Sequence, residues 1–416
     1  MQNNIAPSKQ NLFSSFVFLF LSVLLFLSSM NFMNRYFYFI FIAFILFFFF
    51  NNKSISITPT FFLLLCLSFL FIFFDTVTVK TPNDVIRQFI YPLSYLLGLN
   101  CIKPKTYGTE NSKNNTEKLF LMFCIIISFG LLIHIFLNLY INWDSNDRNV
   151  IDFWVKASSS ATCNAALFCF GIGCLPSFFL NKTGRFHKIF SIFSLVVFVF
   201  FALLLAGRTF FVLFAITFVC VLIYFIFSIE KKSKALKVFL ILSLIILLLA
   251  ILYQNDAFNL KTSFEKSNFY DRFFSENSNI ELDEDGRLRK KALYFSLMGN
   301  YLWGGGELRQ AANTAFAHEL YLDTYSRAGF IPYIMIIVFV FGRTFNALKL
   351  IKSKKLSLFT NCLILGLFIS INIEFLIEPI VEGVPWLLPT FCILCGMVDY
   401  MASCEFDEVT LQADLI

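Results

Sequence analysis

Long runs of apolar residues, separated by short polar turns, fill most of the chain. The runs are continuously apolar and do not alternate, which favours helices over the strands of a membrane barrel. Each run approaches the roughly 20 residues that a helix needs to cross a bilayer. We therefore predict an all-α polytopic membrane protein with about 12 transmembrane helices, at residues 12–30, 36–50, 59–74, 84–101, 119–141, 158–180, 189–206, 209–229, 236–253, 329–348, 357–377 and 386–402.

A long polar segment, residues 254–328, separates the ninth predicted helix from the tenth. Long loops are uncommon and usually functional. Residues 287–298 have the apolar spacing of an amphipathic helix, which the glycines of 303–306 are expected to end. A second short helix is predicted from about Asn313 to Arg327, with Gly329 as its C-terminal breaker.

The predicted chain has four parts: helices one to nine in residues 1–253, a large helical outer loop in 254–328, helices ten to twelve in 329–402 and a cytoplasmic tail in 403–416. Lysine and arginine concentrate in cytoplasmic loops. With the N-terminus in the cytoplasm, the inner loops hold Lys53, Lys103, Lys105, Lys113, Lys118, Lys182, Arg185, Lys188, Lys231, Lys232, Lys234, Lys237, Lys349, Lys352, Lys354 and Lys355. The tryptophans then lie at or near the outer face: Trp143, Trp154, Trp303 and Trp386.

Composition agrees with a membrane location. Hydrophobic residues make up 58% and charged residues 14% of the chain, whereas roughly a quarter of a soluble globular chain is charged. The net charge of +6 follows membrane sidedness, so we expect no nucleic-acid partner. No nucleotide-binding or metalloprotease motif is present, and the outer loop has one His and no Cys. We therefore predict no cofactor and no metal site.

Among the histidines, His318 is the strongest candidate for chemistry, because it lies where the large loop returns to the membrane. On the predicted helix it would share a face with Tyr321 and Tyr325. A neutral imidazole suits a general base near neutral pH, and a histidine packed on tyrosines is the equally good alternative. We expect His134 to pack or form a hydrogen bond, and His187 to be solvated.

Arginines offer candidate anion sites at the same face. Arg208 lies in a tight turn between two long apolar runs, where it either meets a lipid head group or anchors the helices by reaching water. Arg287 opens the predicted loop helix, and its alternative role is a surface salt bridge to the preceding acidic run. Arg87 lies in the first turn of the fourth predicted helix beside Asp84, where it binds an anion or extends to the interface.

Small polar residues open the sixth predicted helix, from Ser158 to Asn164. Such residues allow close helix packing in membranes. They could also line a polar cavity that binds a sugar, although their composition favours packing.

Together these features resemble the O-antigen ligase and polymerase superfamily of bacterial surface-polysaccharide assembly. The resemblance spans roughly residues 140–350 and rests on the order and spacing of several short motifs. A departure is Glu319, where the family commonly has Asn. The matching segments are Ser158–Asn164, Ala206–Thr209, Gly286–Arg287 with Tyr301–Gly306, and His318–Leu322 with Ala328–Phe330.

The resemblance implies a multi-pass glycosyltransferase of the bacterial inner membrane, with its active site on the periplasmic face. The implied reaction is inverting and metal-independent, from a glycan on undecaprenyl pyrophosphate to a glycan acceptor, in contact with membrane lipid. His318 would be the base, and Arg208, Arg287 and Arg87 would bind the pyrophosphate. A chain-length regulator and a flippase are the partner proteins that it implies.

Three readings of the function stay open. The first is a polymerase of O-antigen or capsular repeat units, which is the more numerous group. The second is an O-antigen ligase that transfers the glycan to lipid A–core. The third, a transporter or flippase for the same lipid-linked sugar, is less favoured because the mid-membrane segments look nearly free of charge apart from Glu374.

Overall fold

The computed structural model of the protein describes residues 9–32, 42–46, 48–49, 55–75, 81–102, 110–143, 145, 149–180, 184–205, 209–229, 251–256, 260–265, 270, 287–314, 317–384 and 386–404. These residues are mostly helical, with one small antiparallel sheet in which β1 (Val150–Ile151) pairs with β2 (Ser158–Ser159). The helices are α1 (Lys9–Ser29), α3 (Pro59–Phe74), α4 (Pro82–Gln88), α5 (Ile90–Cys101), α6 (Glu110–Ile141), α7 (Ala161–Ala165), α8 (Phe168–Leu180), α9 (Arg185–Leu205), α10 (Thr209–Ser228), α12 (Leu260–Glu265), α14 (Arg287–Leu297), α15 (Gly305–Ala312), α16 (Leu320–Ala328), α17 (Phe330–Lys352), α18 (Leu358–Ile377), α19 (Ile380–Gly383) and α20 (Leu387–Ser403).

Six helical segments among the described residues are long and apolar enough to cross a membrane. They are Lys113–Ile141, Cys163–Leu180, Arg185–Leu205, Thr209–Ser228, Phe330–Lys352 and Leu358–Ile377. The prediction of a mostly helical chain is confirmed, and these six segments fit the prediction of a membrane protein by their length and composition. The count of about 12 crossings stays a prediction, because the predicted helices 36–50 and 236–253 lie largely outside the described residues.

Two predicted helices are divided in the structure. The predicted helix 84–101 consists of α4 and α5, which meet at Phe89. Helix α4 begins earlier than predicted because Thr81 and Asp84 form a reciprocal capping box. The predicted helix 158–180 consists of α7 and α8, and α7 starts after Ser160, whose hydroxyl caps it.

Large apolar side chains are exposed in stripes along the long helices. On α6 they recur every seventh residue, and on α17 every third or fourth residue, so each stripe follows one helix face. A soluble protein rarely exposes apolar patches of this extent, and lipid contact accounts for them directly. The stripes include Met122, Phe129, Phe136 and Trp143 on or just after α6, Phe62, Phe69 and Phe73 on α3, and Ile331, Ile334, Val338, Phe341, Phe345 and Leu348 on α17.

The described basic residues of the predicted inner loops gather at one end of the helical bundle, here called the lysine end. The backbone N–H of Ser357 donates to Glu117 Oε1 at 3.1 Å, which joins the start of α6 to the α17–α18 connection. Ring contacts of Phe178 with His187 and Phe359 bring the start of α9 to the same end. The residues are Lys113, Lys118, Arg185, Lys188, Lys349, Lys352, Lys354 and Lys355.

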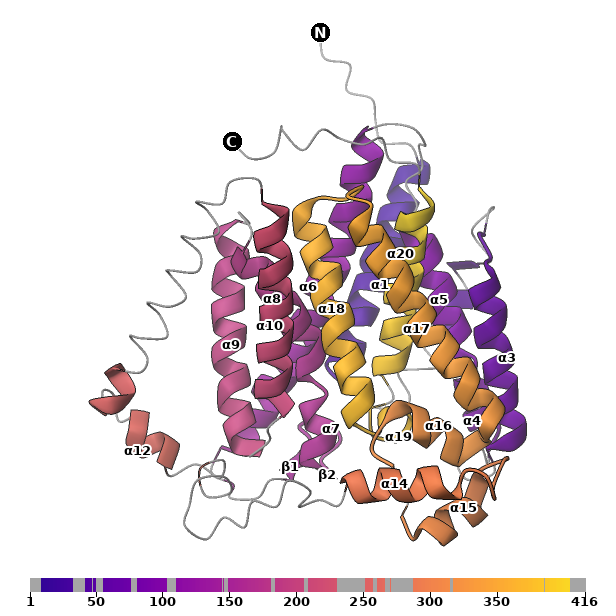
Figure 1. Ribbon diagram of the computed structural model, residues 1–416. Helices are drawn as coiled ribbons and strands as arrows, with labels where there is room; N and C mark the ends of the chain where they lie inside the picture. Colours follow the sequence, from indigo (N-terminus) through magenta and orange to yellow (C-terminus); the bar gives the residue numbers. More distant parts are fainter. Residues whose placement is uncertain are drawn as a thin grey trace.

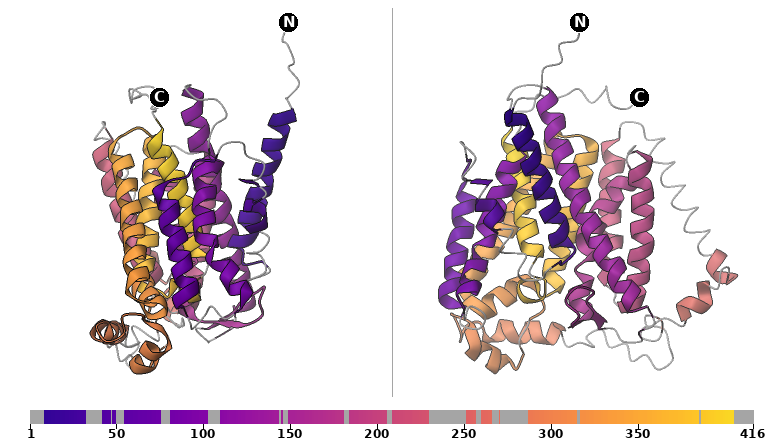
Figure 2. Two further views of the ribbon diagram at one scale, coloured as in Figure 1. Left: turned by 90° about the vertical axis from the view of Figure 1, so that its right-hand side faces the viewer. Right: turned by 180° about the vertical axis from the view of Figure 1, so that it is seen from behind.

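The opposite end, here called the α16 end, holds α14, α15, α16 and α19 (bottom of Figure 1). The side and rear views in Figure 2 show the same helices at that end, across the ends of the long helices. All four tryptophans belong to segments at this end: Trp143 follows α6, Trp154 lies between the two strands, Trp303 follows α14 and Trp386 precedes α20. This arrangement agrees with the predicted aromatic belt.

Candidate functional site

Helix α16 is the buried centre of the α16 end. Each of its residues is buried, including Asp323 and Arg327. The Tyr325 hydroxyl lies 2.5 Å from the Met298 carbonyl oxygen and 2.7 Å from that of Tyr301, so α16 holds the segment that follows α14. A buried helix with polar residues requires partners for them, and these partners define the site.

His318 lies before α16 and not on it. The predicted helix from Asn313 to Arg327 is therefore wrong at its start, although Gly329 ends the helix as expected. The backbone of His318 has a left-handed φ of 58°, which few non-glycine residues adopt. The loop is fixed by Asp323, whose Oδ1 accepts the backbone N–H of Ala317 at 2.7 Å. His318 thus cannot share a helical face with the two tyrosines, and its half-buried ring is positioned by this loop.

Lys291 of α14 connects the His318 loop to the long helices. Its Nζ lies 3.0 Å from Glu319 Oε2 and donates to the Leu376 carbonyl oxygen at 2.7 Å. Glu319 is itself buried and directly follows His318. The Glu319 carboxylate is therefore neutralised by a lysine within the site.

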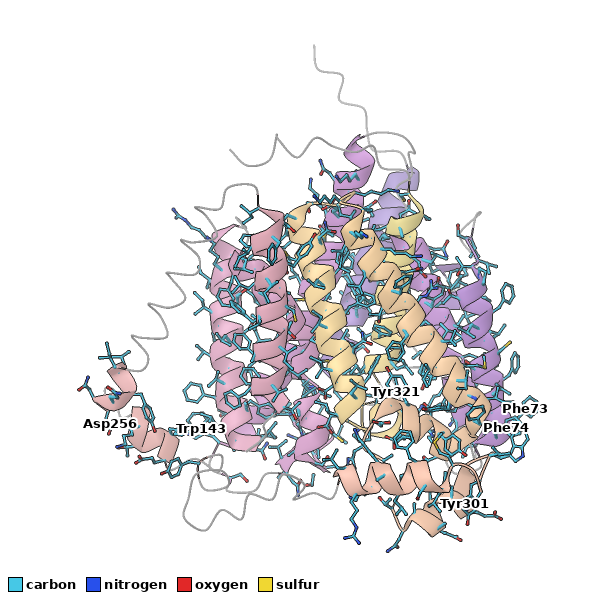
Figure 3. All side chains as sticks on the ribbon, in the orientation of Figure 1. Phe73, Phe74, Trp143, Asp256, Tyr301 and Tyr321 are labelled. Carbon is cyan, nitrogen blue, oxygen red and sulfur yellow. The ribbon has the colours of Figure 1, made fainter. Side chains whose placement is uncertain are left out.

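Tyr321 is the second residue of α16 (Figure 3). Burial, followed by the nearby negative charge of Glu319, raises the pKa of Tyr321 to about 12. Its hydroxyl therefore stays protonated at neutral pH and can donate a hydrogen bond, but it is no base. Among these groups the imidazole of His318 is the better suited to accept a proton near neutral pH.

A buried ion pair stands at the other end of α16. The Nε and Nη2 of Arg327 lie 2.8 Å and 2.6 Å from Asp75 Oδ2, and the two side chains are 4% and 0% exposed. The pair joins α16 to the residue that follows α3. The Ser68 hydroxyl of α3 donates to the Gln88 carbonyl oxygen of α4 at 2.7 Å, so Arg87 on α4 lies beside the helix that Asp75 follows.

Arg87 and His318 consequently lie toward different ends of α16. At 1.5 Å per residue, the eight steps from Glu319 to Arg327 span about 12 Å. Arg87 lies 3.7 Å from Asp84, and both side chains are partly exposed. The arrangement allows Arg87 to meet a part of a ligand that is remote from the imidazole.

The remaining two predicted anion-binding residues are only partly covered. Arg208 lies outside the described residues, between the end of α9 at Leu205 and the start of α10 at Thr209. Arg287 is the first residue of α14, one helical turn before Lys291, and its side chain lies outside the description. The helix face of Lys291 is also the face of Arg287, so the backbone brings Arg287 to the region of Glu319.

The small polar residues of the Ser158–Asn164 segment serve their own backbone. The Asn164 side-chain amide donates to the Ser160 carbonyl oxygen at 2.9 Å, and Ser160 caps α7. The neighbouring loop is tied to α6 because His134 Nε2 lies 2.8 Å from Asp152 Oδ2. His134 therefore has the hydrogen-bonding role expected of it.

Several charged residues of the site were not singled out from the sequence. They are Asp75, Lys291, Arg327 and the buried Glu378, which follows α18. Glu374, near the end of α18, is fully buried as well. The sequence signal that could have identified such residues is a charge at the border of an apolar run, as at Asp75 after α3.

The chain matches no protein-family model, and no curated protein sequence matches it at a significant level. Within the described residues, no group of three His, Cys, Asp or Glu side chains is placed to hold a metal ion.

Proposed function

We propose that the protein is a membrane glycosyltransferase that polymerises O-antigen or capsular repeat units carried on undecaprenyl pyrophosphate. In this proposal the chain crosses the bacterial inner membrane about 12 times, with the lysine end in the cytoplasm and the α16 end on the periplasmic side. The exposed apolar stripes and the lysines at one end support this orientation.

The observation that supports the chemistry is the fixed position of His318. Its loop is held on one side by Asp323 and on the other by the Lys291–Glu319 ion pair. The same lysine lies one turn from Arg287 on α14. A candidate base and a candidate phosphate ligand are thus connected through a single ion pair at the proposed outer face.

The proposed reaction needs no metal. His318 takes the proton of the acceptor hydroxyl as its oxygen attacks the anomeric carbon of the donor sugar, which inverts the configuration there. The bond from that carbon to the pyrophosphate oxygen breaks, and its electron pair leaves with undecaprenyl pyrophosphate. Arg208 and Arg287 would stabilise this developing charge, because guanidinium groups donate two hydrogen bonds to phosphate. Arg87 would contact a more distant part of the donor.

The test is a His318→Ala variant, expressed in a strain that lacks the native protein. General-base assistance is typically worth about 10²–10⁴ in rate, so we expect surface polymer to disappear from gels while the protein still inserts. His187→Ala is the matched control, since His187 lies at the lysine end, and it should retain polymer. Near-normal polymer with His318→Ala would refute the role of the base.

The deletion strain also separates the two acceptors. A single repeat unit on lipid A–core indicates a lost polymerase, as proposed. Core without any repeat unit, together with accumulated lipid-linked chains, would instead indicate a ligase. Purified protein in nanodiscs should elongate lipid-linked repeat units equally well with and without a chelator, and activity that a divalent ion alone restores would contradict the metal-free reaction.

A further inference from the structure

A group of exposed apolar side chains surrounds Trp303 at the α16 end. Trp303 is 58% exposed, although one face of its ring stacks on Phe74, with centroids 5.0 Å apart and an interplanar angle of 12°. Phe73, the neighbour of Phe74 in the chain, is 73% exposed. Leu302, which precedes Trp303, and Phe330, whose backbone N–H donates to Leu302, are also exposed. We call these five residues the Trp303 patch. Figure 3 shows Phe73 and Phe74 at the lower edge of the bundle.

The Trp303 patch continues two of the lipid-facing stripes. The stripe of α3 runs through Phe62 and Phe69 to Phe73, which is the last turn of that helix. The stripe of α17 starts at Phe330 and Ile331, in the first turn of its helix. The patch therefore occupies the border where both stripes reach the end of the bundle.

Short contacts attach the Trp303 patch firmly to α16 and α17. The backbone N–H of Phe330 donates to the Leu302 carbonyl oxygen at 2.9 Å. Gly304 and Gly329 both have a left-handed φ, and a Cβ on Gly304 would lie 2.2 Å from the Tyr325 carbonyl oxygen. Only glycine allows this approach, so the two chain segments touch through their backbones.

We propose that the Trp303 patch is seated in the bilayer interface and anchors the large loop at a fixed depth. The partner is the boundary between lipid head groups and acyl chains. A tryptophan at this boundary keeps its ring in an apolar environment and its indole N–H near water. Because the patch is joined by backbone contacts to α16, lipid would fix the height of the His318 loop above the membrane. The anchor itself does not depend on the proposed reaction.

The test measures lipid contact at Trp303 in the full chain. The protein is reconstituted in vesicles whose lipids are brominated near the head of the acyl chain, and tryptophan emission is compared between the parent and Trp303→Phe. We expect the parent to lose more emission to the brominated lipid than the variant does, while acrylamide in the water quenches the two alike. Trp143→Phe is the control for a tryptophan on the α6 stripe.

A second variant keeps the test valid if the difference signal is small. Replacing Trp143, Trp154 and Trp386 by Phe leaves Trp303 as the sole tryptophan, and brominated lipid should quench its emission. Quenching of Trp303 by acrylamide and not by brominated lipid would overturn the proposal. So would emission that answers to an added soluble oligosaccharide and ignores the lipid, because the patch would then be a sugar-binding surface.

Discussion

The buried Arg327–Asp75 pair allows a quantitative test of how much this ion pair contributes to the stability of the protein. At an effective dielectric constant of about 20, unit charges separated by the observed 2.6–2.8 Å attract each other by roughly 6 kcal/mol. Desolvation of both groups offsets much of this attraction, yet removal of one partner leaves a buried charge and costs about 3–5 kcal/mol. Asp75→Asn removes the charge with little change of shape, so we expect a loss of stability in that range.

The assay is an SDS titration of protein in mixed micelles, followed by tryptophan emission, to which the neighbouring Trp303 contributes. The matched control is Arg87→Gln, since the Arg87–Asp84 pair is partly exposed at 3.7 Å and such pairs contribute about 0–1 kcal/mol. A double variant, Asp75→Leu with Arg327→Met, should recover much of the loss, because an apolar replacement of a buried pair is often neutral. If Asp75→Asn were no less stable than the Arg87→Gln control, the burial argument would be wrong.

Three further predictions concern the site and its surroundings. Lys291→Glu and Glu319→Lys should each lose most surface polymer, and the double exchange should restore part of it; independent single effects that merely add would exclude the ion pair as the link. Arg208→Lys should lose most activity because an ammonium lacks the paired donors of a guanidinium, and full retention would favour simple anchoring. Burial opposes the ionisation of Asp152, but hydrogen bonds from His134 and from backbone N–H groups lower its pKa from 3.8 to about 2. The ionised Asp152 carboxylate therefore stabilises the fold fully above pH 3.8, and this stabilisation is lost as the pH falls toward 2. SDS titrations of the parent and Asp152→Asn should therefore converge at low pH, and a constant difference would contradict this.

The extents of the helices followed from hydropathy where an apolar run has clear borders. The prediction 59–74 coincides with α3, which Pro59 opens and Asp75 follows. Hydropathy alone gave no indication of the interruptions at Phe89 and at Ala166–Leu167, because the apolar run continues through both. Such interruptions depend on capping and on packing against other helices, which no single window of sequence contains.

The arrangement of the site was harder to predict than its location. The sequence pointed to the loop around His318, but it gave a helical backbone where the structure has a left-handed residue. The partners of that loop come from distant segments, and Asp75 and Arg327 are separated by 252 positions in the chain. Charge pairs of this kind arise from the packing of α3 against α16, so they were visible only once the fold was known.

A charged pair within the long helices was also missed, and it bears on the transporter reading. Arg343 of α17 lies 2.5 Å from Asp399 Oδ2 of α20, the Tyr95 hydroxyl donates to the same oxygen at 2.7 Å, and Asn346 donates to Oδ1 at 3.2 Å. The transporter reading was less favoured because the apolar segments looked nearly free of charge apart from Glu374, and this pair adds two charged residues to α17 and α20. Intramembrane charges commonly mark transport pathways, so this pair needs an explanation.

The partners of Asp399 favour a static connection of α5, α17 and α20. Both of its oxygens accept hydrogen bonds. Helix α5 also packs closely on α20 beside it, where a Cβ on Gly396 would lie 2.2 Å from the Tyr95 carbonyl oxygen. Replacing the pair by Arg343→Met with Asp399→Leu should then preserve both insertion and surface polymer, because apolar side chains of similar volume can replace a buried ion pair. Asp399→Leu alone should destabilise the protein, since Arg343 would keep its charge without this partner. A double variant that inserts and is as stable as the parent, yet makes no polymer, would show that the pair moves or transfers charge during function. That result would favour the transporter reading.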